Sequence, residues 1–358
     1  MAEPSAHEVY RSATRFDALD GLRAVAAGLV VAHHCVTENT GYLSRSIGVT
    51  TFFVLSGFLI TRMLIREKEE MRTIEVRRFL LRRTLRIFPL YYVVLGIYVV
   101  LVARFERGTP SGAGFWHSLP WYVTFTSNWF AHFEHGQRDI FYFSWSLAVQ
   151  EQFYLLWPFV LRFTRRRWAA LVPLLFLLSS DALNLLDPGG ANVAWHRVVA
   201  GFDFPIYFGV LTAIALENRR VCAWAEKLAG RSWSIPAALL LMLVPLAVPA
   251  EPQDIISLSA CYLVAACAFS VGPAARLLDN RPMRAVGKVS YGMYLFHMLV
   301  LNAVRRAIPV HLPAVLFLVT LALTILAALA SYRWFEQPVL RWGLRRREAA
   351  VRLAPAGG

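Results

Sequence analysis

Three ionisable side chains interrupt the first apolar stretch of the chain. Residues 22–35 are apolar except for Arg23 near the start and His33 and His34 near the end. Ionisable groups at membrane depth cost roughly 2.5 kcal/mol or more each, so by default they mark a functional site. Arg23 and His34 are eleven residues apart in the sequence, about three helical turns, and therefore share one face roughly 16 Å apart. Because a neutral imidazole accepts a proton near physiological pH, we predict that His34 is a general base.

Simpler roles remain open for the same residues. Asp20 lies three residues before Arg23, so the two can form an ion pair that caps and anchors the helix. His34 could instead be a histidine that is hydrogen-bonded between helices. His33 is rotated about 100° from the face that holds Arg23 and His34, and we interpret it as a packing neighbour.

A basic cluster precedes the third apolar stretch. Arg83 and Arg86 lie at i,i+3 in this cluster, where paired guanidinium groups can bind phosphate oxygens. Anchoring to anionic lipid headgroups is the alternative, and it is the better interpretation for Arg77 and Arg78. Pro89 disfavours an ordinary uninterrupted helix here, so we expect Arg83 and Arg86 to line a shaped pocket.

Two further polar groups lie within apolar segments. Gln150, Glu151 and Gln152 fall about halfway along residues 141–162, where such side chains need a partner or a wet cavity. A packing network between helices is the alternative. Ser290, Tyr294 and His297 occur at i, i+4 and i+7, which predicts a polar stripe on one helix face. For His297, a structural role and a substrate contact are equally compatible with this pattern.

The elements that position these residues are apolar helices. The 358 residues are 57% hydrophobic and 17% charged, and the mean hydropathy is +0.47. Soluble domains average roughly 45–50% apolar and 25% charged residues, so the composition predicts an all-α, polytopic membrane protein. About ten spans are predicted from the apolar runs. They are residues 19–36, 48–64, 86–103, 141–162, 168–184, 195–215, 233–249, 255–273, 288–304 and 312–335.

The distribution of basic residues predicts the topology. The net charge of +14 comes from arginines and lysines that gather in alternate connections between the apolar runs. This asymmetry favours the positive-inside rule over nucleic-acid binding and places both termini in the cytoplasm. We expect a cytoplasmic tail over residues 1–15, a transmembrane domain over 16–340 and a basic cytoplasmic tail over 341–358. The four cysteines show no CxxC spacing, so neither a disulfide framework nor a metal site is expected.

Five segments in the same order resemble the membrane-bound acyltransferase-3 family of bacterial O-acyltransferases. They are LDGLRAVAAGLVVAHH (19–34), GVTTFFVLSGFLIT (48–61), RRTLRIFPLYY (82–92), SWSLAVQEQFYLLWP (144–158) and GKVSYGMYLFH (287–297). SYRWFEQP (331–338) also fits the family's last helix. The resemblance implies about ten transmembrane helices in a bacterial inner membrane. It also implies transfer of an acyl group, commonly acetyl, from cytoplasmic acyl-CoA to a hydroxyl of a carbohydrate or glycosylated acceptor.

The resemblance also implies roles for individual residues. His34, not His33, corresponds to the family's essential histidine, and Glu151 to the glutamate of the fourth motif. Arg23 corresponds to the first-helix arginine, and Arg83 and Arg86 to an RxxR pair. The chain departs from the usual pattern at three positions, Thr50, Phe143 and Gln150, where many members carry Asp, His and Glu. The SGNH domain that some relatives append is not expected here.

Together these observations predict a catalytic site and leave one alternative function. The catalytic set is His34 and Glu151, and acyl-CoA, a co-substrate and not a permanently bound cofactor, is assigned to Arg83, Arg86 and Arg23. Candidate acceptor or oxyanion contacts are Ser290, Tyr294, His297 and Trp145. The acceptor remains open among polysaccharide, lipid-linked sugar, oligosaccharide and macrolide. The rival is a transporter or exporter that uses the same intramembrane residues.

Overall fold

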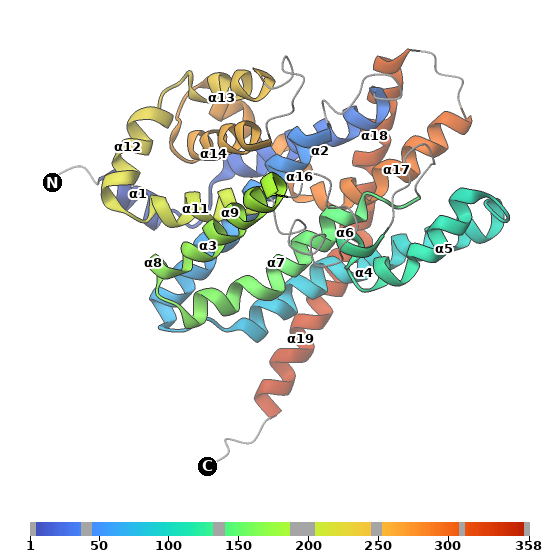
Figure 1. Cartoon of the computed structure of the whole chain (residues 1–358), viewed down its shortest axis with the longest axis horizontal. Helices are drawn as coiled ribbons and strands as arrows, with labels where there is room; N and C mark the ends of the chain where they lie inside the picture. The colour runs from blue at the N-terminus through green and yellow to red at the C-terminus, as the bar shows by residue number, and fades with distance from the viewer. Residues whose placement is uncertain are drawn as a thin grey trace. The chain divides into compact units, whose positions relative to one another are not determined.

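The protein is built from helices, as the sequence predicts. The computed structural model describes residues 5–36, 45–131, 140–186, 205–244, 253–307 and 312–353. Every regular element within these residues is helical (Figure 1). The chain forms two compact units, the first from Met1–Thr73 and Leu161–Ile325 and the second from Ile74–Val160 and Leu326–Gly358.

The first unit holds most of the helices. They are α1 (Ala6–Ser12), α2 (Asp17–Val36), α3 (Arg45–Met71), α8 (Arg166–Ala169), α9 (Leu171–Leu186), α11 (Ile206–Leu216), α12 (Arg219–Ala229), α13 (Ser234–Leu243), α14 (Gln253–Phe269), α15 (Pro273–Leu278), α16 (Arg281–Lys288), α17 (Ser290–Ala307) and most of α18 (Pro313–Ser331). The second unit is built mainly from α4 (Val76–Phe105), α5 (Pro110–Val123), α6 (Ser127–Phe130), most of α7 (Ser144–Phe163), the π-helix η2 (Tyr332–Glu336) and α19 (Gln337–Leu353).

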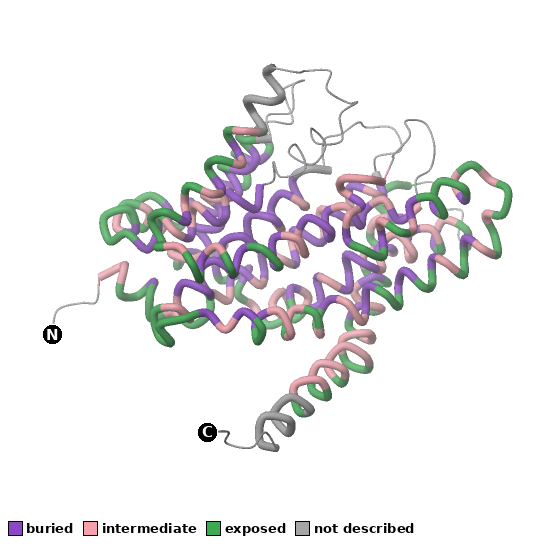
Figure 2. The backbone as a smooth tube through the Cα atoms, turned by 60° about the horizontal axis from the view of Figure 1, so that its bottom comes forward, coloured by how far each residue is buried: buried purple, intermediate pink, exposed green. Residues whose placement is uncertain are grey.

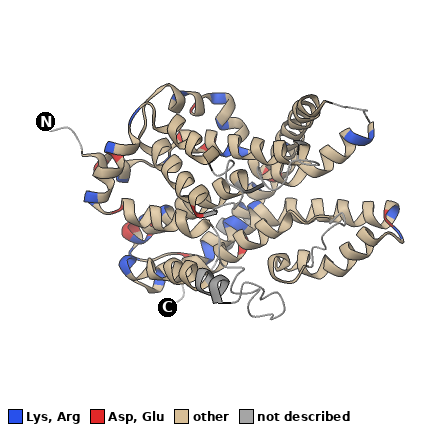
Figure 3. Cartoon of the chain, turned by 45° about the horizontal axis from the view of Figure 1, so that its top comes forward, with Lys and Arg blue, Asp and Glu red and all other residues tan. Residues whose placement is uncertain are grey.

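The predicted apolar segments coincide with helices. The stretch 19–36 corresponds to α2, 48–64 to the apolar part of α3, and 312–335 to α18 with η2. Parts of the predicted helices 195–215 and 233–249 lie outside the described residues. Lysine, arginine, aspartate and glutamate residues lie mainly near helix ends and connections, whereas long stretches of helix contain none of them (Figure 3).

The predicted interruption at Pro89 is wrong. Helix α4 begins at Val76 and continues through Pro89 to Phe105. A proline removes one backbone hydrogen bond and normally kinks or ends a helix in water. In an apolar surrounding the helical backbone is the arrangement that satisfies the other amide groups internally, so a long apolar helix tolerates a single proline.

Three described helices are long and apolar enough to cross a membrane. They are Ile47–Met71, Val76–Phe105 and Pro313–Arg345, with mean hydropathies of 1.7, 2.1 and 2.5 over their best windows. The first of these windows is 78% buried by protein, but the other two are only 39% and 22% buried. Their large exposed apolar surface is suited to contact with lipid chains. The third span includes the first part of α19, a helix that is partly exposed and amphipathic (Figure 2).

Close backbone contacts fix α2 within the first unit. A Cβ atom at Gly21 of α2 would lie 1.9 Å from the carbonyl oxygen of Leu278 in α15. At Gly287 of α16 it would lie 1.8 Å from the carbonyl oxygen of Asp20. Only glycine permits such an approach, so the two positions lock α2 against α15 and α16. Helix α17 begins two residues after α16 ends, and it also packs on α2.

Buried aromatic rings hold the second unit together. Phe125 and Phe141 adopt positive φ angles of 54° and 65°, which are uncommon for bulky residues. Both rings pack on Tyr91 of α4, at centroid distances of 4.3 and 5.6 Å. The side-chain amide of Gln152 donates a hydrogen bond to the carbonyl of Phe125 over 2.8 Å. These contacts join α4 and α7 to the segment that follows α5.

Candidate functional site

His34 lies in the last turn of α2, beside two other imidazoles. Its ring centroid is 5.1 Å from that of His297 in α17 and 4.7 Å from that of His33. His297 and His33 are buried, whereas His34 is partly exposed. Arg305 of α17 donates a hydrogen bond to the His34 carbonyl over 3.3 Å, and so places a positive charge at the C-terminal end of α2.

The predicted polar stripe on α17 is buried in the first unit. Ser290 and Tyr294 are each 7% exposed, and His297 is fully buried. The Tyr294 and His297 rings lie 5.5 Å apart, and His297 Nδ1 is hydrogen-bonded to the backbone carbonyl of Tyr294. The stripe therefore brings a hydroxyl, a phenol and an imidazole onto one side of the helix that packs on α2.

Arg23 forms the ion pair that its spacing predicts. Its Nη1 atom lies 3.6 Å from Oδ1 of Asp20, and Asp20 also accepts hydrogen bonds from Arg15. Asp17 and Asp20 lie in the first turn of α2, where carboxylates interact favourably with the helix dipole. The anchoring ion pair left open for Asp20 and Arg23 is thus present in the structure. Arg23 keeps about a quarter of its side chain exposed, at 24%.

Arg83 and Arg86 have different surroundings in the second unit. The guanidinium carbon of Arg83 lies 5.3 Å from the ring centre of Tyr154 in α7 and 5.6 Å from that of Phe79. Such contacts are favourable for a planar cation. Arg86 is exposed and is attracted electrostatically to Glu336 of η2. The two arginines repel each other, so an anion between them would relieve that repulsion.

Glu151 and Gln152 are adjacent on α7 but interact with different partners. Glu151 is partly buried, and its charge attracts that of Arg83. Gln152 exchanges amide hydrogen bonds with Asn128 over 3.2 and 2.8 Å, besides its bond to the Phe125 carbonyl. The packing alternative therefore holds for Gln152, while Glu151 faces a cation. Trp145, in the first turn of α7, is partly buried.

The candidate residues are distributed over both units. His34, Arg23, Ser290, Tyr294 and His297 belong to the first. Arg83, Arg86, Glu151 and Trp145 belong to the second. Sequence spacing predicts the grouping within α2, α4 and α17. It does not predict the contacts between helices, of which His34 with His297 and Arg83 with Tyr154 are the clearest.

Comparison with known proteins identifies the family. A family model described as an acyltransferase domain, the acyltransferase-3 model, matches residues 16–333. The chain belongs to the acyltransferase-3 family. The apolar helices and this membership together indicate a multi-pass membrane protein. No solved structure matches the chain.

Several curated proteins resemble this acyltransferase-3 chain over 91% of its length. It is 31% identical to a Bacillus subtilis protein named "Putative peptidoglycan O-acetyltransferase YrhL", of which it covers 55%. It is 29% identical to the O-acetyltransferase OatA of Staphylococcus aureus, with 57% coverage of that protein. It is 27% identical to the peptidoglycan O-acetyltransferase OatA of Listeria monocytogenes, with 56% coverage. The chain therefore spans about half the length of these relatives.

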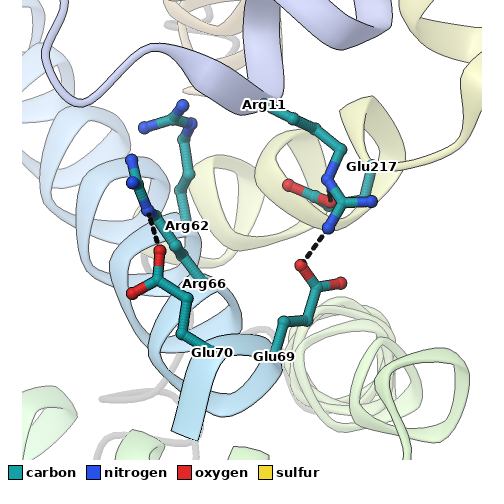
Figure 4. A pocket seen from close by; sticks show the side chains of 6 residues that line it. All are labelled: Arg11, Arg62, Arg66, Glu69, Glu70 and Glu217. Atoms are coloured by element: carbon teal, nitrogen blue, oxygen red, sulfur yellow. Dashed lines mark hydrogen bonds and ion pairs between the residues drawn. The ribbon is translucent and has the colours of Figure 1, made fainter.

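The acyltransferase-3 chain also contains a polar cavity that sequence reasoning missed. It measures about 240 Å³ and lies in the first unit (Figure 4). Three arginines and three glutamates line it, namely Arg11, Arg62, Arg66, Glu69, Glu70 and Glu217. Arg62 donates hydrogen bonds to the carbonyls of Tyr10 and Ala13, 2.6 Å each, and so holds α1 against α3. The only sequence signal is an arginine that directly follows the apolar run 48–61.

Glu217 is the most buried carboxylate of this cavity. It lies 3.3 Å from Arg166 and 3.8 Å from Arg11. Burial and the nearby charge of Glu69 raise the pKa of Glu217, while the arginines act in the opposite direction. Since each carboxylate in the cavity already has an arginine partner, the cluster acts as an internal clasp between α1, α3 and the α11–α12 connection.

Proposed function

We propose that the chain is an integral membrane O-acyltransferase. It transfers an acyl group from acyl-CoA to a hydroxyl of a carbohydrate or glycosylated acceptor. The acyl group is proposed to be acetyl, as is common in the family. The relatives named as peptidoglycan O-acetyltransferases favour a polysaccharide acceptor. The proposed topology has about ten spans, both termini in the cytoplasm and the transferase domain over residues 16–340.

His34 is proposed as the general base. It accepts the proton of the acceptor hydroxyl as the oxygen attacks the thioester carbonyl. The new ester C–O bond forms, the C–S bond breaks, and the proton passes from His34 to the departing CoA thiolate. The products are the ester and free CoA. The thioester supplies a good leaving group, and the developing oxyanion requires hydrogen-bond donors, for which Ser290 and Tyr294 are proposed.

Arginines are proposed to bind the co-substrate. Arg83 and Arg86 would bind phosphate oxygens of acyl-CoA, with Arg23 as a further cation. Glu151 would orient Arg83, whose charge it attracts. Trp145 and His297 complete the proposed set of contacts around acceptor and acyl group.

One observation supports the proposal most directly. His34 is a partly exposed imidazole in an apolar helix whose neighbouring histidines are buried. Proton abstraction from an incoming hydroxyl requires a base that the hydroxyl can reach. The match to the family across residues 16–333 supports the same reaction class.

Replacing His34 with alanine tests the function. We expect His34→Ala to lower kcat by roughly 10²–10⁴-fold, the usual contribution of a general base. CoA release from acetyl-CoA would be measured with purified protein in lipid nanodiscs and soluble glycan acceptors. Exposed His117 provides the matched control, and His117→Ala should keep wild-type activity. Normal transfer by a folded His34→Ala protein would exclude His34 as the base, and substrate movement without CoA release would favour the transporter.

A further inference from the structure

Helix α12 carries large apolar side chains that are exposed on its surface. Trp224 is 65% exposed, Leu228 58% and Val221 41%. Because successive residues of a helix are rotated by about 100°, these three positions, spaced i, i+3 and i+7, lie on one face. A connected apolar face of this kind marks contact with lipid or with another protein.

The other two sides of α12 have different surroundings. Cys222 and Ala229 are buried, and with Ala225 they pack in the apolar core of the first unit. Arg220 and Lys227 are exposed on the side away from that core. Helical phase places the exposed apolar face between the buried side and the basic side. The helix therefore presents one side to protein, one apolar side and one basic side.

Hydrogen bonds define both ends of α12. At its start, the side chain of Asn218 accepts a hydrogen bond from the backbone N–H of Arg220 over 2.9 Å. At its end, the hydroxyls of Ser234 and Tyr262 each donate a hydrogen bond to the Leu228 carbonyl over 3.1 Å. Since Tyr262 belongs to α14, the end of α12 is held against that helix and its apolar face has a fixed direction.

The next helix, α13, continues the exposed apolar surface. It follows α12 after a short connection and contacts it (Figure 1). Its exposed side chains include Leu239, Leu240, Leu241 and Leu243. Trp233, at the junction of the two helices, is 57% exposed. Because tryptophan is enriched where a membrane meets water, the α12–α13 junction has the character of that boundary.

Basic side chains accompany the exposed aromatic ring of α12. Residues 219–231 contain four basic residues and one acidic residue, namely Arg219, Arg220, Lys227, Arg231 and Glu226. The Nζ atom of Lys227 lies 5.5 Å from the ring centre of Trp224. Long lysine and arginine side chains beside an apolar face extend their charges towards lipid headgroups. The excess of positive charge favours a negatively charged surface.

We propose that α12 is an interfacial helix that lies in the membrane surface and binds anionic phospholipid headgroups. Trp224 and Leu228 enter the boundary of the acyl chains, where apolar faces of such helices lie about 5–10 Å deep. Arg220 and Lys227 contact the phosphate groups. Lipid fits this face better than a protein, because the apolar surface continues onto α13 and is bordered by cations. This inference requires the multi-pass membrane arrangement, but it does not depend on the proposed transfer reaction.

Fluorescent labels on two sides of α12 test its position. Glu226 is exposed and lies two residues before Leu228, so its side chain is rotated by about 200° from the apolar face. The fluorophore NBD is attached to Leu228→Cys or to Glu226→Cys in the full chain, reconstituted into vesicles of phosphatidylcholine and phosphatidylglycerol. Doxyl lipids should quench the label at 228 at least about threefold more than the label at 226, and aqueous iodide should do the reverse. The parent protein gives the background from its partly exposed Cys261.

Charge variants test the preference for anionic lipid. For the label at 228, doxyl-labelled phosphatidylglycerol should quench about threefold more than doxyl-labelled phosphatidylcholine at equal content. Adding Arg220→Gln and Lys227→Gln should bring this ratio close to one. The matched control is Arg104→Gln with Arg107→Gln, which removes the same charge from exposed positions near the end of α4 and should leave the ratio unchanged.

Several outcomes would contradict the interfacial role of α12. Stronger quenching by iodide than by doxyl lipid at 228 would place the apolar face in water. Protection of that label from both quenchers would assign the face to a partner protein or to a second copy of the chain. Equal quenching by the two doxyl lipids would refute the anionic headgroup site. No substrate enters the measurement, so its result is distinct from a failure of acyl transfer.

Discussion

At the scale of single residues, Arg83 differs from the neighbouring Arg78 in the partners of its guanidinium group. Its guanidinium lies over the Tyr154 ring and is attracted by Glu151, so it is held in place. We expect Arg83→Ala to raise the KM for acetyl-CoA about tenfold or more, because a hydrogen bond to a charged group contributes roughly 1.5–3 kcal/mol. Initial rates of CoA release at varied acetyl-CoA give this value. Arg78 is exposed and pairs with Glu75 over 3.5 Å, and Arg78→Ala should leave the KM unchanged.

An equal KM in the Arg83 and Arg78 variants would assign both arginines to lipid anchoring.

The sequence predicts the i,i+3 relation of Arg83 and Arg86 because helical phase is a local property. It does not predict that Arg83 faces α7 while Arg86 is exposed and attracted by Glu336, since those partners come from distant parts of the chain. The same distinction separates His34, identified by its own helix, from His297, which helix packing brings to it.

At the scale of helices, α2 contains a matched pair of glycines. A Cβ atom at Gly21 would meet the Leu278 carbonyl at 1.9 Å, whereas at Gly28 it would meet nothing within 4 Å. We expect Gly21→Ala to lower the stability by roughly 1–3 kcal/mol, because the backbones of α2 and α15 must move apart. Gly28→Ala should leave the stability unchanged or raise it by about 0.5–1 kcal/mol through helix propensity. Thermal unfolding in detergent measures both.

If both alanine variants melt alike, the backbone contact does not hold α2 in place. Local sequence predicts that α2, α3 and α17 exist, since apolar runs are local signals. The predicted ends of α2 and α17 agree closely with the structure, whereas α3 continues beyond the predicted residue 64 to Met71. It fails at Pro89, where the expected break does not occur and α4 runs unbroken for 30 residues. The physical reason is that proline's effect depends on the surroundings of the helix, and these are set by tertiary packing and lipid.

At the scale of the whole molecule, composition predicts the fold class, whereas the burial of each helix and the polar cavity depend on helix packing. The apolar content predicts an all-α membrane protein, and the structure and family membership agree. The window in α3 is the most buried of the three candidate spans, at 78%, and has the lowest mean hydropathy, 1.7, against 2.1 and 2.5 for the less buried windows. Hydropathy therefore ranks the exposure of these helices, but it does not predict which helices cover α3. The polar cavity around Arg62 and Glu217 is likewise a product of packing, because α1 and the end of α11 each add a side chain to those of α3.

The arginine distribution makes a prediction about topology that cysteine labelling can test. Ala113 on α5 lies in the connection expected outside, and Thr73 between α3 and α4 lies in the basic connection expected in the cytoplasm; both are exposed. With a membrane-impermeant maleimide, Ala113→Cys should be labelled in intact cells and Thr73→Cys only after permeabilisation. The parent protein controls for its four cysteines, three of which are buried. Basic connections are retained on the cytoplasmic side during insertion, which is why the two sites should differ. Labelling of Thr73→Cys in intact cells would invert the orientation and move the proposed CoA-binding arginines of α4 away from the cytoplasmic supply of acyl-CoA.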